Sequence, residues 1–375
     1  MVLLRMALRT GRAPHSRGAG TGLLLAALLG LLPMGASCAS EPEVDEEALL
    51  ASYMETASRY FQMGQYERCV HQANRGLEVD PANERFKLIK GRALLLVREN
   101  NTVALEQAHA VLREIQGLDD WRVDVTLGEV EERRGIVRLD GAREIEAGER
   151  YTDAPDPLAR AAELREEARE LWQAALEHYA AVLAKVTGNS EALSGRMRVA
   201  TLLGEETLAL EAGRQLVQSL TESNRALERK IESLRNEASD PVRQRRSLAA
   251  NEEVIVTTHV HMAELHHAAG RTAAALLELE TAREIDGLRP EVHGRIAQLL
   301  LELGDASGAK TSIETFFAIS DLPFDHPDIV KARETRRACD ELLRQQARQS
   351  VDEEALLASH METATRYFQM GQYER

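Results

Sequence analysis

Four histidines lie close together at positions 259, 261, 266 and 267, and imidazole is the commonest metal ligand in proteins. His259 and His266 are seven residues apart and share one face of a predicted helix, whereas His261 points elsewhere. The sequence contains no HExxH spacing and none of the GxxxxGKS/T, GxSxG or dinucleotide-binding glycine motifs. We therefore predict packing roles for these histidines, no metal ion or other cofactor, and no enzymatic activity.

Three cysteines, Cys38, Cys69 and Cys339, are too few for a disulfide framework. Cys69 occupies a position where the repeat described below requires a small buried residue, so we predict that it belongs to the core. Cys339 lies on a polar helix predicted over residues 328–348 and is a candidate free thiol.

The composition excludes several classes of protein. Lysine and arginine total 46 and aspartate and glutamate 61, which gives a formal net charge of −15. Because an acidic surface repels phosphate backbones, nucleic acid is not an expected partner. Aromatic residues make up only 4% of the chain, while alanine, leucine, glutamate and arginine are abundant. This composition favours helices and argues against a β-sandwich or a β-barrel.

Residues 1–37 have the composition of a targeting segment, with arginines and no acidic residue. The apolar stretch from Leu23 to Met34 is shorter than the ~20 residues that span a bilayer. The Gly-Ala-Ser-Cys run that ends at Cys38 resembles the lipoprotein box of bacterial lipoproteins, in which the cysteine is acylated. The residues before Cys38 also fit an ordinary secretory peptide cut within a residue of it, or a mitochondrial-type presequence.

The lipoprotein resemblance implies that Cys38 carries the lipid and that residues 38–48 form an acidic tether. It also implies a location in the cell envelope, either periplasmic or anchored to the outer membrane. Secretion is the alternative location.

Small residues recur with a period of about 34 residues. Counting from Ala57, a glycine lies seven positions on at Gly64 and a small residue twelve positions on at Cys69. Two further sets follow the same steps, namely Ala263, Gly270 and Ala275, and Ala297, Gly304 and Ala309. Small residues let two antiparallel helices approach closely, and the glycine relieves the backbone where the first helix ends. The pattern predicts stacked helical hairpins, each of which covers the apolar face of the next.

This pattern resembles the tetratricopeptide repeat family. The first repeat carries the resemblance best, through Tyr53, Ala57, Tyr60, Gly64, Tyr66, Cys69, Ala73, Leu77 and Pro81. Two further copies lie over 256–323, a fair copy over 190–223, and one with a poor turn over 84–117. The resemblance implies an all-α solenoid of antiparallel helix pairs that binds proteins or peptides, mainly along the first helix of each pair.

We predict an organisation in eight parts. They are a signal peptide (1–37), the acidic tether (38–48), an N-terminal repeat block (49–150), a loop rich in proline and aspartate (151–157), a helical block with one extended helix (158–238), two repeats (242–323), a capping helix (325–349) and a half repeat (351–375).

The extended helix carries a heptad stripe. Apolar residues from Val217 to Ala238 alternate at three and four positions, with Asn224 in the same row. Such a stripe pairs with another helix, and a buried asparagine fixes the register of the pair. The stripe predicts either a long hairpin with residues 242–269 or a homodimer.

Residues 351–375 nearly copy residues 44–68. Only two positions differ, His360 for Tyr53 and Thr365 for Ser58, so 23 of 25 match. A late duplication and an artefact of gene assembly both account for this identity. The copy supplies a first helix without a second one. It leaves an apolar face, around Tyr367 and Phe368, that must dock on the preceding helix or on another chain.

Four residues are our candidates for partner binding, namely Phe61, Arg85, Arg92 and Arg198. They occupy first-helix positions that the resemblance places on the concave face. Arg85 and Arg92 share one helical face, and with Phe61 they suit an acidic or amphipathic peptide, although ordinary solvated arginines fit the same pattern. The Lys/Asn/Lys/Arg clamp by which some members of the family hold a terminal carboxylate is not reproduced, which disfavours that class of ligand.

The sequence thus predicts a non-catalytic scaffold in the cell envelope that holds a protein or peptide partner in a superhelical groove, in an assembly or adaptor role. The alternative is a structural protein that self-associates through the heptad stripe and the half repeat.

Overall fold

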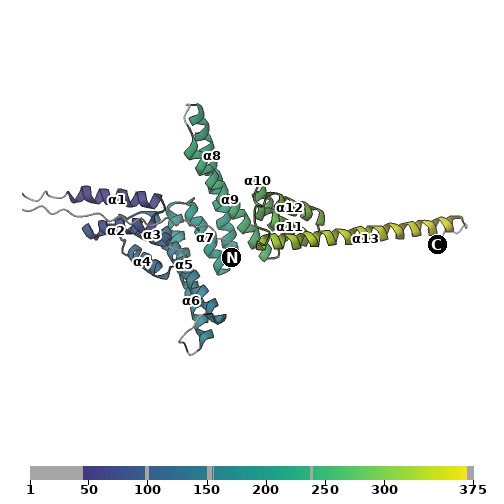
Figure 1. Cartoon of the computed structure of the whole chain (residues 1–375), viewed down its shortest axis with the longest axis horizontal. Coiled ribbons are helices and arrows are strands. Elements are labelled where there is room, and N and C mark those ends of the chain that lie inside the picture. Colours follow the sequence, from purple (N-terminus) through teal and green to yellow (C-terminus); the bar gives the residue numbers. More distant parts are fainter. Residues whose placement is uncertain (1–44, 98–100, 150–153, 155, 237–239, 370–375) are drawn as a thin grey trace, which may run out of the picture. The chain divides into compact units, whose positions relative to one another are not determined.

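The computed structural model describes residues 45–97, 101–149, 154, 156–236 and 240–369 (Figure 1). These residues form thirteen α-helices and, among themselves, no β-strand, so the all-α class is confirmed. The helices are α1 (Glu46–Gln62), α2 (Tyr66–Val79), α3 (Glu84–Val97), α4 (Thr102–Arg113), α5 (Trp121–Glu146), α6 (Pro157–Lys185), α7 (Ser190–Leu203), α8 (Glu206–Asn236), α9 (Val242–Ala268), α10 (Thr272–Ile285), α11 (Pro290–Glu302), α12 (Ala306–Ile319) and α13 (Pro327–Gln369).

Each helix packs against the next one in the chain, from α1 to α13. The first helices of successive pairs also meet, because α1 contacts α3, α3 contacts α5 and α5 contacts α7. The described chain is therefore an all-α solenoid of helix pairs, and its first helices share one face.

Glycines end the first helices at the predicted turns. Gly64, Gly204, Gly270 and Gly304 follow α1, α7, α9 and α11, and all four have left-handed backbones with φ between 69° and 83°. A residue with a Cβ atom is strained in this conformation. The sequence spacing therefore located the turns at Gly64, Gly270 and Gly304 correctly.

The predicted small residues lie in the interfaces between helices. Ala57, Ala275, Ala297 and Ala309 are completely buried, and Ala263 is 2% exposed. A larger side chain at any of these positions would push two helices apart, since protein interiors are closely packed.

Two helix pairs are longer than the repeat. We predicted one extended helix, and the structure has a long hairpin of α5 (26 residues) and α6 (29 residues) as well as one of α8 (31 residues) and α9 (27 residues). The predicted loop at 151–157 separates α5 from α6, which pack together, so it falls inside a hairpin rather than between two blocks. Because α5 and α6 contain many charged residues, the sequence did not indicate that these two helices pair.

The heptad stripe of α8 packs on α9 of the same chain. The side chain of Asn224 accepts a hydrogen bond of 2.8 Å from Nδ2 of Asn251, and Leu220 and Ile231 are buried. The hairpin alternative is thus the one observed, and an asparagine pair fixes its register.

Glycines on α5 and α7 receive aromatic rings from α6. An added Cβ at Gly135 would lie 2.3 Å from the indole nitrogen of Trp172. At Gly195 it would lie 2.2 Å from the ring of Tyr179, which is itself completely buried. The close approach of α5, α6 and α7 therefore depends on these glycines.

The predicted capping helix and half repeat form one continuous helix. α13 runs from Pro327 to Gln369, which is 43 residues. No proline or glycine interrupts residues 328–369, so no local signal ends the helix at the predicted boundary near residue 350. Only its first half is packed, against α11 and α12.

Candidate functional site

A groove of about 540 Å³ lies on the face formed by the first helices α1, α3 and α5. Its lining includes three of the four predicted binding residues, Phe61, Arg85 and Arg92. The complete lining is Met54, Ser58, Phe61, Gln62, Arg85, Leu88, Ile89, Arg92, Leu118, Asp119, Asp120 and Arg122. The structure thus brings together residues from three successive helix pairs.

Helical spacing arranges the residues that α3 contributes to the groove. Arg85, Leu88 and Arg92 are three and four residues apart, so they lie in one row on the face of the helix. Leu88 is buried, whereas Arg85 is exposed and Arg92 is half-buried. The row therefore presents a cation, an apolar patch and a second cation.

The loop between α4 and α5 closes the groove and is held by Glu84. The carboxylate of Glu84 accepts hydrogen bonds of 2.8 Å from the backbone N–H groups of Gln116 and Gly117. These two bonds hold the pKa of Glu84 below its ordinary value, because they stabilise the charged form. The first turn of α3 thereby fixes the loop that supplies Leu118 and Asp119.

The carboxylates of the groove already have partners. Asp119 accepts from Nζ of Lys185 at 3.1 Å. Asp120 lies 3.4 Å from Nε of Arg122 and also caps the N-terminus of α5. Within the part of the chain that the structure describes, neither Arg85 nor Arg92 pairs with a carboxylate. The charge that remains unpaired in the groove is positive.

Arg92 is positioned by an aromatic ring instead. Its guanidinium carbon lies 5.1 Å from the centroid of the Phe61 ring, and Phe61 packs edge-on against Tyr66 with 5.5 Å between ring centroids. A cation over a ring keeps its N–H groups available for a ligand.

Arg198, the fourth predicted binding residue, is not among the groove residues. It lies on α7 and makes two hydrogen bonds, of 2.7 and 2.8 Å, to the carboxylate of Glu132 on α5. The Glu132 side chain is 8% exposed and also accepts a hydrogen bond of 3.0 Å from the hydroxyl of Tyr179. The position of Arg198 thus reflects the joining of α5, α6 and α7.

The environment of this cluster shifts two pKa values. Burial opposes the charge of Arg198, but the hydrogen bonds and the attraction from Glu132 outweigh it, so the pKa of Arg198 is raised. Burial, and then the neighbouring Glu132, raise the pKa of the Tyr179 hydroxyl well above its ordinary value. Arg198 therefore stays charged and Tyr179 stays neutral.

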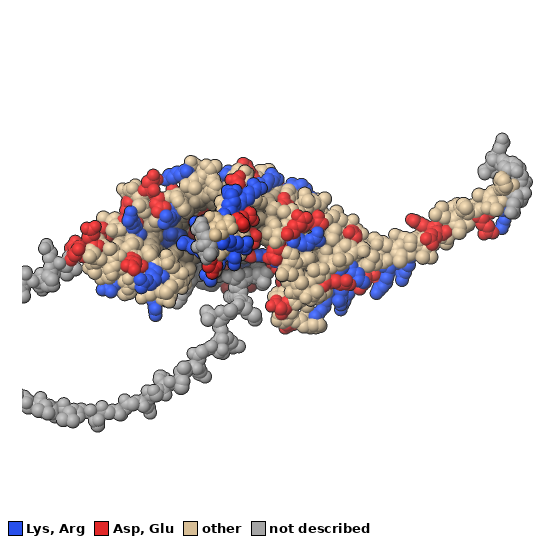
Figure 2. All heavy atoms as spheres, turned by 90° about the horizontal axis from the view of Figure 1, so that it is seen from above, with Lys and Arg blue, Asp and Glu red and all other residues tan. Residues whose placement is uncertain are grey.

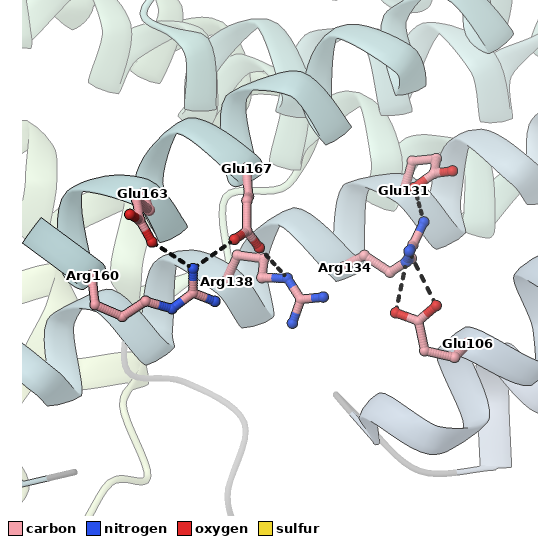
Figure 3. A network of polar contacts seen from close by, with 7 residues as sticks. All are labelled: Glu106, Glu131, Arg134, Arg138, Arg160, Glu163 and Glu167. Carbon is pink, nitrogen blue, oxygen red and sulfur yellow. Dashed lines mark hydrogen bonds and ion pairs between the residues drawn. The ribbon is translucent and has the colours of Figure 1, made fainter. Parts of the chain in front are cut away.

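Sequence reasoning also missed a chain of ion pairs along α5 (Figure 3). Arg134 makes a two-bond contact with Glu106 at 3.0 and 3.1 Å and a third bond of 2.7 Å with Glu131. Further along α5, Arg138 pairs with Glu167 of α6 at 3.0 Å. The contacts of Arg134 with Glu106 and of Arg138 with Glu167 join separate helices. In the sequence, their charge pattern resembles that of a solvated helix face.

The four histidines have separate partners. The ring of His259 lies 2.6 Å from Glu278, His261 lies 3.0 Å from Thr201, His266 accepts from Arg271 at 2.9 Å, and His267 lies 2.9 Å from Glu302. Among the residues that the structure describes, no three His, Cys, Asp or Glu side chains are placed to hold a metal ion.

The two cysteines in the described residues are buried free thiols. Cys69 is completely buried, as predicted, and burial raises its pKa to about 11. Cys339 is also completely buried, although its helix is polar, and burial raises its pKa too. Neither thiol has the depressed pKa that a nucleophile requires.

The predicted signal peptide (1–37), Cys38 and most of the acidic tether (38–48) lie outside the described residues. Among the helices described, none combines the length and apolar character needed to cross a bilayer. Acidic and basic side chains are intermixed over the face that Figure 2 shows.

No protein-family profile and no curated protein sequence matches the chain. The similar solved structures include tetratricopeptide repeat proteins. One is a thermophilic repeat protein of Thermus thermophilus, with 17% identity, 67% of this chain and 99% of that chain covered, and a TM-score of 0.38. Another comes from Parabacteroides merdae, with 14% identity, 77% and 98% covered, and a TM-score of 0.32.

A third similar structure is the TPR2AB domain of yeast Sti1, determined as a complex with pHSP90. It shows 10% identity, with 79% of this chain and 99% of that chain covered and a TM-score of 0.23. All three TM-scores lie below 0.5, and the assignment of the fold rests on the helix pairs and turn glycines described above.

Proposed function

We propose that the chain is a non-catalytic scaffold that holds an acidic, amphipathic segment of a protein partner in the groove of α1, α3 and α5. One observation carries the proposal: Arg85 and Arg92 pair with no carboxylate of the described chain and flank the apolar floor formed by Leu88 and Ile89. An assembly or adaptor role fits such a site, because the groove combines cationic and apolar groups that can recognise a segment of another protein.

Recognition follows from the chemistry of the two arginines and of the apolar floor between them. Acidic side chains of the ligand accept hydrogen bonds from the guanidinium groups of Arg85 and Arg92, which favour carboxylates because two N–H groups can bind one carboxylate. Apolar side chains between those acids cover Leu88, Ile89 and the Phe61 ring. The two aspartates of the groove lining, Asp119 and Asp120, repel an acidic ligand less than unpaired carboxylates would, because their own partners neutralise them.

Replacing both Arg85 and Arg92 by alanine should weaken binding by roughly a hundredfold or more, since each arginine donates to a carboxylate and each such hydrogen bond contributes about 1.5–3 kcal/mol. Peptides selected from a random display library on the immobilised full-length chain should be enriched in Asp and Glu interleaved with apolar residues. The affinity of a selected peptide for the wild type and the double variant, measured by fluorescence anisotropy, checks the prediction.

The matched control replaces Arg225 and Arg229, two exposed arginines of α8 outside the groove, by alanine. It removes the same charge from the chain and should leave the affinity unchanged. The affinity for the wild type should also fall as salt is raised, because exposed charges are screened. Selected peptides without acidic residues, or equal binding to both double variants, would exclude the groove as the site.

We also propose that the scaffold is anchored in the cell envelope by a lipid on Cys38. The support is the resemblance of the run before Cys38 to the lipoprotein box. The intact mass of the protein from the membrane fraction should correspond to a chain that begins at Cys38 and carries acyl groups. A mature chain without lipid that starts beside Cys38 would instead indicate secretion.

A further inference from the structure

The second half of α13 (yellow in Figure 1) carries the sequence of α1 but does not have the surroundings of α1. Every residue from Arg344 to Phe368 is exposed. The apolar side chains there include Leu357, which is 63% exposed, and Met361, which is 70% exposed. We call this exposed half of α13 the exposed arm, and in Figure 2 most of its side chains are uncharged.

The structure also contains the surface that this sequence fits. In α1, Ala57 is completely buried in a cluster with Cys69 of α2 and Ala93 of α3. Tyr60 and Phe61 pack against the same cluster. The surface of α2 and α3 therefore recognises a helix of this sequence, and Ala57 is the residue of α1 that it buries completely.

Each contact residue of α1 has a counterpart on α13. Ala364 corresponds to Ala57 and Tyr367 to Tyr60, and both are exposed on α13. The two differing positions do not touch the centre of the interface, because Tyr53 and Ser58 are only half-buried in α1. The exposed arm is thus a second helix with the binding face of α1.

The helix that occupies the surface is weakly held. Ala57 is the only buried residue among the 17 of α1. As the first helix of the described array, with so few buried side chains, α1 detaches more readily than the interior of that array. The surface of α2 and α3 is therefore intermittently open to another helix.

We propose that residues 351–368 of one copy of the chain dock on α2 and α3 of a second copy, in the site that α1 otherwise fills. The exchange replaces one set of contacts by a nearly identical set, as in domain swapping. It also rebuilds the groove, since Met361 and Thr365 then stand where Met54 and Ser58 line it. A second copy would thus supply the part of the groove lining that α1 otherwise provides.

The strength of this association follows from the competition with α1. The helix of the same chain acts at an effective concentration in the mM range, and the copy must compete with it. In α1, the Tyr53 ring lies 4.8 Å from the guanidinium carbon of Arg75, and α13 has His360 at that position. The association is therefore reversible and rises with protein concentration, and it does not require the groove to bind a peptide.

Disulfide trapping in the full-length chain tests the proposal. Ala364→Cys places a thiol where Ala57 meets Cys69, so oxidation should link the introduced thiol to Cys69 of a second copy. Disulfide-linked multimers on non-reducing gels should increase with protein concentration, and peptide mass spectrometry should identify the bond. Cys69→Ser in the same background should abolish it.

The matched control is Glu362→Cys, on the opposite face of the same helix turn, where the corresponding Glu55 is exposed in α1. It should give no bond to Cys69. A second variant, Ala364→Glu, should remove concentration-dependent association in sedimentation velocity without affecting the fold, because Ala364 is exposed. The proposal is overturned by a bond to Cys69 within a single chain, by equal trapping at both positions, or by no trapping at mM concentration.

Discussion

Gly195→Ala should destabilise the junction of α5, α6 and α7 by about 2 kcal/mol. The added Cβ would lie 2.2 Å from Cζ of Tyr179 and 2.6 Å from two further ring carbons. The ring cannot move away easily, because it is completely buried and its hydroxyl is bonded to Glu132. Overpacking of this kind costs about 1–3 kcal/mol and sometimes more, and alanine regains up to about 1 kcal/mol through its helix propensity.

Urea unfolding followed by circular dichroism measures the loss, and hydrogen exchange shows whether it is confined to α5–α8. The matched control is Gly294→Ala on α11, where the nearest atom to the added Cβ is Cδ2 of Phe316 at 3.3 Å. Because this contact needs only a small adjustment, the control should stay within about 1 kcal/mol of the wild type. An unfolding midpoint for Gly195→Ala equal to that of the control would show that α6 and α7 do not pack as described.

Glu132→Ala should cost about 3 kcal/mol in the free energy of unfolding. It leaves the buried Tyr179 hydroxyl without its acceptor and the guanidinium of Arg198 without its carboxylate. Removing one member of a buried ion pair typically costs 3–5 kcal/mol. The value expected here is at the lower end, because the Arg198 side chain is 43% exposed and can turn toward water.

A double-mutant cycle with Arg198→Ala isolates the pair, since the sum of the two single losses should exceed the loss in the double variant. Glu55→Ala is the control, because its partner Arg59 is 68% exposed and such surface pairs contribute at most about 1 kcal/mol. Additive losses at Glu132 and Arg198 would contradict the bidentate contact. The cycle also separates a structural role for Arg198 from the partner-binding role that its sequence position suggests.

The parts of the fold that could be predicted are those specified locally. Gly270 and Gly304 end their helices because the left-handed backbone favours glycine, and Ala275 is small because two helices cross there. Each of these requirements concerns one residue and its neighbours in the same hairpin. A regular spacing in the sequence is therefore enough to locate them.

The long α5–α6 hairpin could not be predicted for the opposite reason. Gly135 admits Trp172 from a helix that begins 22 residues later, and Glu132 meets Arg198 across 66 positions. Neither local sequence indicates which distant residue its side chains contact. In the groove, the helical row of Arg85 and Arg92 was visible in the sequence, but the pairing of Asp119 with Lys185, which leaves the row positively charged, was not.

The burial of Cys69 beneath α1 gives the protein an internal reporter. The thiolate is the form that attacks thiol reagents, and burial keeps this thiol protonated by raising its pKa to about 11. Alkylation of Cys69 at neutral pH therefore reports on molecules in which α1 has detached from α2 and α3. Its rate, divided by the rate for an unfolded chain, gives the equilibrium constant for detachment of α1 without any label added to the chain.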